Sequence, residues 1–120
     1  MRGFLYLFVC LTNLAQAEIS INNEQLSINS GLYNIAQNLG QTVGNNLFHI
    51  FDRFSLEQGE TAQFSGDNSI QNIISRVVGG KASVINGTIQ STIPNADFYL
   101  LNPWIKTNCE VKSASSVFCS

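Results

Sequence analysis

Apolar and polar residues alternate along much of this chain, in short stretches separated by turn-forming residues. Residues 18–28 read EISINNEQLSI, with the alternation continuing on both sides of Asn22 and Asn23. Because successive side chains of a strand point to opposite faces, this pattern predicts two short strands joined by a turn. Residues 31–44 carry apolar residues near helical spacing. Glycine at 31, 40 and 44 favours loop and strand instead, since each glycine costs about 1 kcal/mol inside a helix.

The alternation is clearest between residues 46 and 101. Four segments rich in β-branched and aromatic residues follow one another, with turns expected at Gln58–Gly59, Gly79–Gly80 and, as a hairpin-like turn, Asn86–Gly87: NLFHIFDRFSLEQGETAQFSG, NSIQNIISRVVGG, ASVINGTIQSTI and ADFYLL. Many short strands with frequent turns predict an all-β fold.

Two architectures fit this pattern equally well: a small sandwich or barrel, and a β-solenoid. In a solenoid, neutral Asn and Thr side chains at equivalent positions of successive coils can form ladders without charge repulsion. Phe64 and Ile85 are 21 residues apart, which is an interval within the range of known repeats.

The first seventeen residues have the pattern of a secretory signal peptide. Arg2 precedes an apolar run at 4–11, and Ala15 and Ala17 form an Ala-x-Ala ending that predicts cleavage before Glu18. The run is shorter than the roughly 20 residues needed to cross a bilayer, so a membrane anchor is not expected. The alternative is a buried N-terminal strand or helix.

Composition excludes several classes of partner. Loss of Arg2 with the signal peptide leaves five basic against eight acidic residues, and the net charge moves from −2 to −3. Nucleic acids and anionic membranes require clustered Lys and Arg, so neither is an expected partner. Charged residues make up only 12% of the chain, and the predicted surface is therefore polar but mostly neutral.

Candidate catalytic and metal-binding groups are sparse. His49 is the only histidine, and Asp52 lies three residues away in a strand-like stretch, so the two side chains should point to opposite faces. Glu57 and Glu60 flank a turn, and no carboxylates have the spacing of a general acid and base. The cysteines lack metal-ligand spacing. We therefore expect no enzyme activity, no metal and no cofactor, and a structural hydrogen-bonding role for His49.

Four separated segments, in order, resemble a known family. GNNLFHIFDRFSLEQGETAQFSG, SIQNIISRVVGG, SVINGTIQS and NADFYLLNP resemble the N-terminal secretion (TPS) domain of filamentous-haemagglutinin-type exoproteins of two-partner secretion systems, especially cyanobacterial ones. The similarity is strong from Gly44 to Pro103 and looser before it. The family-motif positions, with structural or transporter-recognition roles, are Asn46, Leu47, Phe48, His49, Phe51, Phe54, Asn86, Gly87, Asn102 and Pro103.

The resemblance implies a right-handed parallel β-helix with an N-terminal β cap. It also implies export to the periplasm of a Gram-negative cell and capture by a dedicated outer-membrane transporter, which delivers the exoprotein to the cell surface or the medium. Adhesion or haemagglutination, with a possible host or cell-surface glycan as partner, belongs to the repeat region that normally follows. One hypothesis for capture is strand addition between the transporter's periplasmic domains and residues 46–66 of a partly extended chain.

The similarity stops at Pro103. Family members continue with a glycine-containing β run, whereas Trp104 and Ile105 follow here. This predicts three segments: a signal peptide at 1–17, a partial secretion domain at 18–103 and a divergent tail at 104–120. We expect a truncated or frame-shifted domain whose last coil has an unpaired end, although a short capping tail is the alternative.

The cysteines separate the remaining readings. None lies between residues 18 and 108, as threading of an unfolded chain through a pore would favour, and Cys109 and Cys119 lie in the tail. One rival function is a self-sufficient small β module for carbohydrate binding or adhesion, in which those two cysteines would form a disulfide. The other rival is a β-helical polysaccharide-active enzyme.

Overall fold

The computed structural model describes residues 18–103 and 109–111, and nearly all of its regular structure is β-strand. A single-turn 3-10 helix, η2, covers Gln37–Leu39. The strands are β1 (Ile19–Ile21), β2 (Glu24–Gln25), β3 (Ile28–Asn29), β4 (Leu32–Ala36), β5 (Gln41–Val43), β6 (Asn46–Phe51), β7 (Arg53–Phe54), β8 (Thr61–Ser65), β9 (Asn72–Val77), β10 (Thr88–Ser91), β11 (Asp97–Leu101) and β12 (Cys109–Val111).

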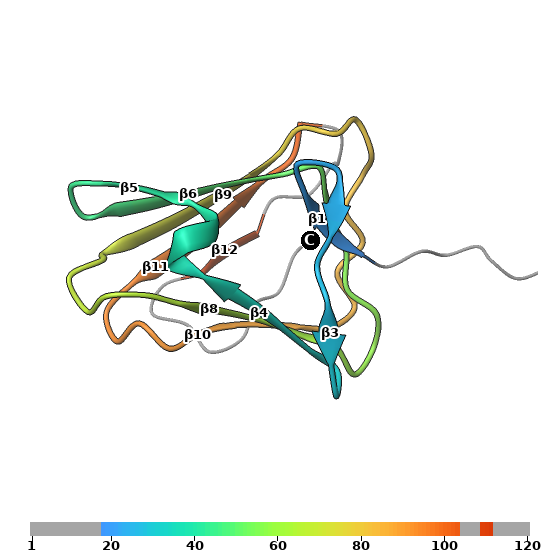
Figure 1. The fold of residues 1–120 in the computed structure, drawn as a ribbon, viewed down its shortest axis with the longest axis horizontal. Helices are drawn as coiled ribbons and strands as arrows, with labels where there is room; N and C mark the ends of the chain where they lie inside the picture. Colours follow the sequence, from blue (N-terminus) through green and yellow to red (C-terminus); the bar gives the residue numbers. More distant parts are fainter. Residues whose placement is uncertain (1–17, 104–108, 112–120) are drawn as a thin grey trace, which may run out of the picture.

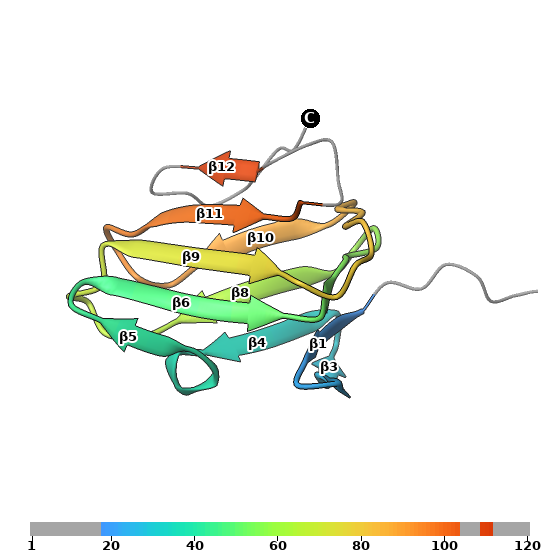
Figure 2. The ribbon, with the colours of Figure 1, turned by 90° about the horizontal axis from the view of Figure 1, so that it is seen from above.

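The chain passes back and forth between two sheets. Strands β4, β8 and β10 pair in parallel in a sheet of order β10-β8-β4-β3, whereas β6, β9 and β11 pair in parallel in a sheet of order β12-β11-β9-β6-β5. These six strands alternate between the sheets in chain order, so each circuit of the chain adds one strand to each sheet (Figures 1 and 2). A third sheet, β2-β1-β7, lies at one side.

Successive circuits place similar residues beside one another. Leu47 faces Ile73, and Ile73 faces Phe98, so three apolar side chains form one inward row of the five-stranded sheet. Tyr33, Ala62 and Ile89 form the matching row of the four-stranded sheet. All six are at most 3% exposed. The core therefore lies between the two sheets, and the alternation in the sequence is what points these rows inward.

Aromatic rings fill the middle of this core. Phe64 contacts four other rings, with centroids 5.0 Å from Phe98, 5.4 Å from His49, and 6.3–6.4 Å from Phe54 and Phe51. Offset and edge-to-face pairs at such distances add about 0.5–1.5 kcal/mol each beyond the burial of area. The rings come from β6, β7, β8 and β11, so the cluster joins both parallel sheets and β7.

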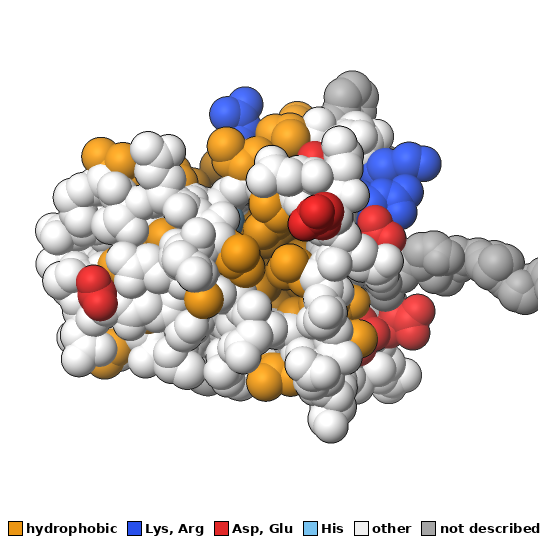
Figure 3. Space-filling model, in the orientation of Figure 1, with side chains coloured by type: hydrophobic (Ala, Val, Ile, Leu, Met, Phe, Trp, Pro, Cys, Tyr) orange, Lys and Arg blue, Asp and Glu red, His pale blue; other side chains and the backbone are white. Residues whose placement is uncertain are grey.

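Antiparallel pairs occupy the N-terminal end of the structure. The predicted turn at Asn22–Asn23 is confirmed, since β1 and β2 pair around it and both asparagines have positive φ (55° and 65°), a conformation that asparagine tolerates. β3 pairs with β4, and β5 pairs with β6. In Figure 3, apolar side chains gather in the centre of this end and charged side chains are few. These antiparallel strands therefore leave apolar side chains exposed at this end of the structure.

The predicted loop-and-strand character of residues 31–44 is confirmed. β4, η2 and β5 occupy the stretch, and the single 3-10 turn was not anticipated. Gly40 ends that turn, where a Cβ atom would overlap the carbonyl oxygen of Phe48 and lie 2.8 Å from His49 Cδ2. This glycine is therefore needed because β6 approaches closely.

At the other end, the edge of β11 is not open, contrary to our expectation of an unpaired last coil. Phe98–Leu100 pairs antiparallel with Cys109–Val111 of the tail, and Figure 2 shows β12 lying outside β11. Within the described residues, β10 has no strand on its outer side. One of the two parallel sheets thus ends with a covered edge and the other with an uncovered one.

One finer expectation is wrong. Asn86–Gly87 is not a hairpin turn, because Ile85 and the following strand β10 both pair with an earlier circuit rather than with each other. The 21-residue interval between Phe64 and Ile85 does not correspond to a pairing, since Phe64 faces Ser91 and Ile85 forms an isolated parallel bridge with Leu56. Spacing and turn propensity carry no information about which distant strand a residue meets.

The predicted all-β fold is confirmed. The sheets are mixed, and among the described residues none closes into a barrel. Residues 18–103 and 109–111 include no helix with the length and apolar character needed to cross a membrane.

Candidate functional site

The family-like motif at the start of the five-stranded sheet divides between the two faces of β6. Leu47, His49 and Phe51 point inward and are at most 1% exposed, whereas Phe48 points outward and is 36% exposed. Phe54, on β7, is also buried in the aromatic cluster. Most of these motif residues therefore belong to the core, whereas the Phe48 side chain is exposed on the outer face of β6, where a partner could contact it.

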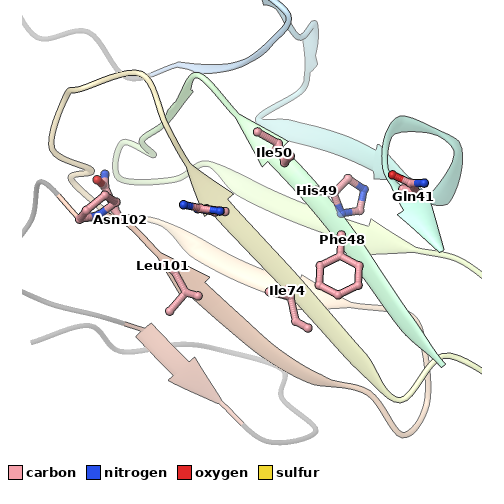
Figure 4. A pocket seen from close by; sticks show the side chains of 9 residues that line it. Gln41, Phe48, His49, Ile50, Ile74, Leu101 and Asn102 are labelled. Atoms are coloured by element: carbon pink, nitrogen blue, oxygen red, sulfur yellow. The ribbon is translucent and has the colours of Figure 1, made fainter. Parts of the chain in front are cut away.

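The outer face of the five-stranded sheet carries a groove of about 800 Å³ around Phe48. Figure 4 shows Phe48, Ile74 and Leu101 projecting from three neighbouring strands. The residues that line the groove are Gln41, Phe48, His49, Ile50, Ile74, Arg76, Leu101, Asn102 and Pro103. We call this feature the outer groove.

Strand register assembles the outer groove. Phe48 faces Ile74 and Ile50 faces Arg76 across β6 and β9, and Arg76 in turn faces Leu101 of β11. These side chains are apolar apart from Arg76, and Ile50 and Leu101 are 58% and 44% exposed. A contiguous exposed apolar surface on a sheet marks an interaction site more often than isolated exposed residues do.

The four-stranded sheet presents a different outer surface. Gln63 of β8 accepts a hydrogen bond of 2.7 Å from the side-chain amide of Gln90 in the next circuit, and Asn34 occupies the same row on β4. Thr61 and Thr88 are neighbours in a second row, whose member on β4 is Leu32. The apolar outer surface is thus a property of one sheet and not of the fold in general.

His49 has the structural role that the sequence predicted. Its Nε2 lies 3.2 Å from the carbonyl oxygen of Ala36, and its ring stacks on Phe51 with centroids 5.8 Å apart. Burial lowers the pKa of His49, and the hydrogen bond to Ala36 opposes this shift in part. Although the residue lines the groove, it is only 1% exposed.

The carboxylates have local roles. Asp52 accepts a hydrogen bond from the backbone N–H of Asn23, and Glu60 accepts one of 2.8 Å from the backbone N–H of Glu57. In the described part of the chain, no group of three or more His, Cys, Asp or Glu side chains is gathered as metal ligands would be. Asp52 and Glu60 thus each accept a hydrogen bond from a backbone N–H group in a turn or loop.

Asn102 joins the outer groove to the loop that precedes β10. It is 3% exposed, and its side-chain amide donates hydrogen bonds to the carbonyl oxygen of Lys81 (3.0 Å) and to Ser83 Oγ (2.9 Å). Pro103 follows at the exposed end of the groove. The Asn-Pro motif therefore lies beside the Phe48 motif in space, although the sequence separates them widely.

The other motif positions lie outside the groove. Asn46 begins β6 and accepts a hydrogen bond of 2.9 Å from Asn72, which is the predicted kind of polar ladder. Asn86 donates its backbone N–H to the carbonyl of Leu56 at 2.8 Å. A Cβ atom on Gly87 would overlap the carbonyl of Glu60, so this glycine permits a close approach of two circuits.

The predicted cleavage site lies mostly outside the described residues. Ala15 and Ala17 are not described, whereas Glu18 begins the described chain, where its carbonyl accepts the N–H of Ser55 (2.9 Å) and its carboxylate lies 3.5 Å from Arg53. Sequence reasoning also missed Ile50, Ile74, Arg76 and Leu101 as groove residues. The available signal was that residues 47–51 place apolar side chains on both faces of one strand.

Comparison with known proteins identifies the family. The chain matches the family model of the TPS secretion domain over residues 13–104. Searches of curated proteins and of solved structures returned no match. The matched region contains nearly every described residue and both motifs at the outer groove, and we conclude that the chain belongs to the TPS secretion domain family.

Proposed function

We propose that this chain is the recognition domain by which a secreted or surface-exposed adhesin-like exoprotein is exported through the two-partner pathway of a Gram-negative cell. Membership of the TPS secretion domain family implies the recognition role. The signal-peptide pattern of residues 1–17 supports passage across the inner membrane first, with cleavage before Glu18. The partner is an outer-membrane transporter of the two-partner type.

The fold proposed for this domain is the first part of a right-handed parallel β-helix with an N-terminal β cap. The alternation of parallel strands between two sheets, one strand per sheet in each circuit, supports it. The Asn46–Asn72 and Gln63–Gln90 hydrogen bonds are side-chain ladders of the kind that stacked coils make possible.

We assign the outer groove as the surface that the transporter's periplasmic domains bind. The observation that carries this assignment is that members of two family-like motifs, Phe48 and Pro103, line one groove whose exposed side chains are largely apolar. Core packing is enough to explain why the buried motif positions are apolar. Core packing does not explain the exposed apolar residues around Phe48, because polar side chains would be better solvated at those positions.

Strand addition at residues 46–66 would require an unfolded segment. In the folded domain β6 pairs with β5 and β9, and β8 pairs with β4 and β10, so neither strand has a free edge. The outer groove needs no such opening, and docking there leaves the sheet intact.

The proposal is tested by binding of residues 18–120 to the periplasmic domains of two-partner-secretion transporters from the organism that carries this gene. Ile50→Asp places a charge in the groove, and we expect the dissociation constant to rise at least tenfold. Val84→Asp is the matched control, because Val84 is equally exposed (57% against 58%) but lies outside the groove, and it should bind as the wild type does.

Secretion provides the second readout. A reporter fused after residue 120 should reach the medium with the wild-type and Val84→Asp domains and accumulate in the periplasm with Ile50→Asp. Thermal unfolding of each variant checks that the folded state is retained. A second groove variant, Leu101→Asp, is measured in the same way. If both aspartate variants bind and are secreted as the wild type is, the groove is not the docking surface. Failure of the wild-type domain to bind would contradict the recognition role itself.

A further inference from the structure

Two buried polar side chains lie opposite each other on β6 and β9, which are neighbouring strands of the five-stranded sheet. His49 Nδ1 and Ser75 Oγ each lack a hydrogen-bond partner among the described residues, and their side chains are 1% and 0% exposed. The two residues are directly opposite in the parallel register of β6 and β9. Neighbours in register have Cβ atoms about 5 Å apart, which is within reach of both functional groups.

The chemistry of the two atoms is complementary. A carbonyl oxygen only accepts hydrogen bonds, so the contact of His49 Nε2 with Ala36 requires that Nε2 carries the proton of the neutral ring. Nδ1 then has a lone pair directed into the interior. The hydroxyl of Ser75 can rotate and donate to it. An unsatisfied buried polar atom costs about 1–3 kcal/mol, and here one hydrogen bond would satisfy two such atoms.

We infer that Ser75 Oγ donates a hydrogen bond to His49 Nδ1, directly after rotation about χ1 or through one enclosed water, and that this buried pair makes the folded domain sensitive to acid. Protonation of Nδ1 would turn the acceptor into a donor. The bond would then have to reverse, and a charge would lie within the core.

No charged group within the described residues is placed to stabilise that charge. Strands β4, β5, β6 and β8 carry no Asp, Glu, Lys or Arg, and their other titratable group besides His49 is Tyr33, whose raised pKa keeps it neutral in this range. On β9 and β11, Arg76 and Tyr99 lie on the outer face, and Asp97 lies at the start of its strand, three positions from the row that contains His49. The imidazolium would therefore remain uncompensated.

The direction of the pH effect follows from this burial. The pKa of His49 in the folded chain lies below its ordinary value of 6.5, so the unfolded chain binds a proton more readily. This contribution to stability is complete above pH 6.5 and is lost as the pH falls through and below that value. Between pH 8 and pH 5 the folding equilibrium constant should fall by up to about thirtyfold, the limit for a folded state that never binds the proton.

The first test uses the imidazole as its own reporter. Because His49 is the only histidine, its ring nitrogens give unambiguous NMR signals. We expect Nε2 to be protonated and Nδ1 to be hydrogen-bonded and unprotonated at pH 7.5. In Ser75→Ala, the Nδ1 resonance should move by several ppm toward that of a free lone pair, whereas Ser65→Ala should leave it unchanged. A proton on Nδ1, or an unchanged Nδ1 signal in Ser75→Ala, would overturn the pair.

The second test measures the urea midpoint of residues 18–120 between pH 8 and pH 5. Aspartate and glutamate ordinarily titrate near pH 4, so the imidazole dominates this window. The wild-type midpoint should fall with acidification, and this fall is the contribution of His49. His49→Gln should abolish it. A pH-independent midpoint in the wild type would refute the acid sensitivity without bearing on transporter binding at neutral pH.

Discussion

Asn72 donates a side-chain hydrogen bond of 2.9 Å to Asn46, its neighbour in register on the preceding circuit of the chain. The next position of the same row is Asp97 on β11. The neutral amide of Asn72 therefore lies between Asn46, at the start of β6, and the acidic side chain of Asp97. The arrangement shows why a domain built by repeated stacking favours asparagine, since identical charges in one row would repel.

Replacing the middle amide by a carboxylate should make this row pH-dependent. Asn72→Asp loses the donor to Asn46 and places a second carboxylate beside Asp97, and we expect a loss of about 1–2 kcal/mol in unfolding free energy at pH 7. Asn72→Ala loses only the hydrogen bond. Urea unfolding at pH 7 and at pH 3.5 distinguishes them: the deficit of the aspartate variant relative to Asn72→Ala should shrink at the lower pH, and an unchanged difference would contradict the repulsion.

The aromatic cluster predicts a sharp contrast between two phenylalanines. Phe64 is fully buried and contacts four rings, so Phe64→Ala should lower the unfolding free energy by about 3–5 kcal/mol. Phe48→Ala, the same change on the exposed face of β6, should cost less than about 1 kcal/mol. Equilibrium unfolding followed by far-UV circular dichroism measures both. Similar losses at the two positions would mean that the cluster does not organise the core.

Gly40 should tolerate no side chain, because the carbonyl of Phe48 and the ring of His49 occupy the space that a Cβ would fill. We expect Gly40→Ala to destabilise the domain by about 1–3 kcal/mol and to perturb the His49 ring signals. The control is Gly44→Asn, since Gly44 has open space around it and asparagine accepts its φ of +63°. A milder effect at Gly40 than at Gly44 would contradict the close approach.

Asn102 should protect the loop that contains Lys81. Its amide donates to the carbonyl of Lys81 and to Ser83, and Asn102→Ala removes both hydrogen bonds. Because proteolysis requires local opening, trypsin should cleave after Lys81 about tenfold faster in the variant, as expected from a loss of about 1.4 kcal/mol in local stability. Cleavage after Arg53 serves as the internal reference, measured by mass spectrometry. Equal rates after Lys81 would show that the loop is held by other contacts.

Several features of the fold were accessible from local pattern. The alternation at residues 18–28, the paired asparagines and the glycines between 31 and 44 each describe chemistry within a few residues, and the structure confirms the hairpin and the absence of a long helix there. The inward direction of Leu47, His49 and Phe51 likewise follows from the two-residue period of a strand. Resemblance to the family added the functional class, which no local pattern contained.

The sequence did not predict features that depend on which distant segments of the chain pair with each other. Ile85 bridges Leu56, and Asn86–Gly87, which was expected to form a hairpin-like turn, passes between stacked circuits. The last coil was expected to have an unpaired end, whereas β12 pairs with β11. Turn propensities and spacings are the same for either pairing, so only the packed chain distinguishes them.

The sequence by itself determined that this protein is all-β and carries few charged residues, because composition and two-residue alternation depend only on the residues themselves and their neighbours. The tertiary structure decided the register of the circuits. That register brings Phe48 beside Ile74, it places Leu101 and Pro103 in the same outer groove, and it puts His49 opposite Ser75. Hydrogen bonding between strands far apart in the chain selects one register, and each register creates a different surface.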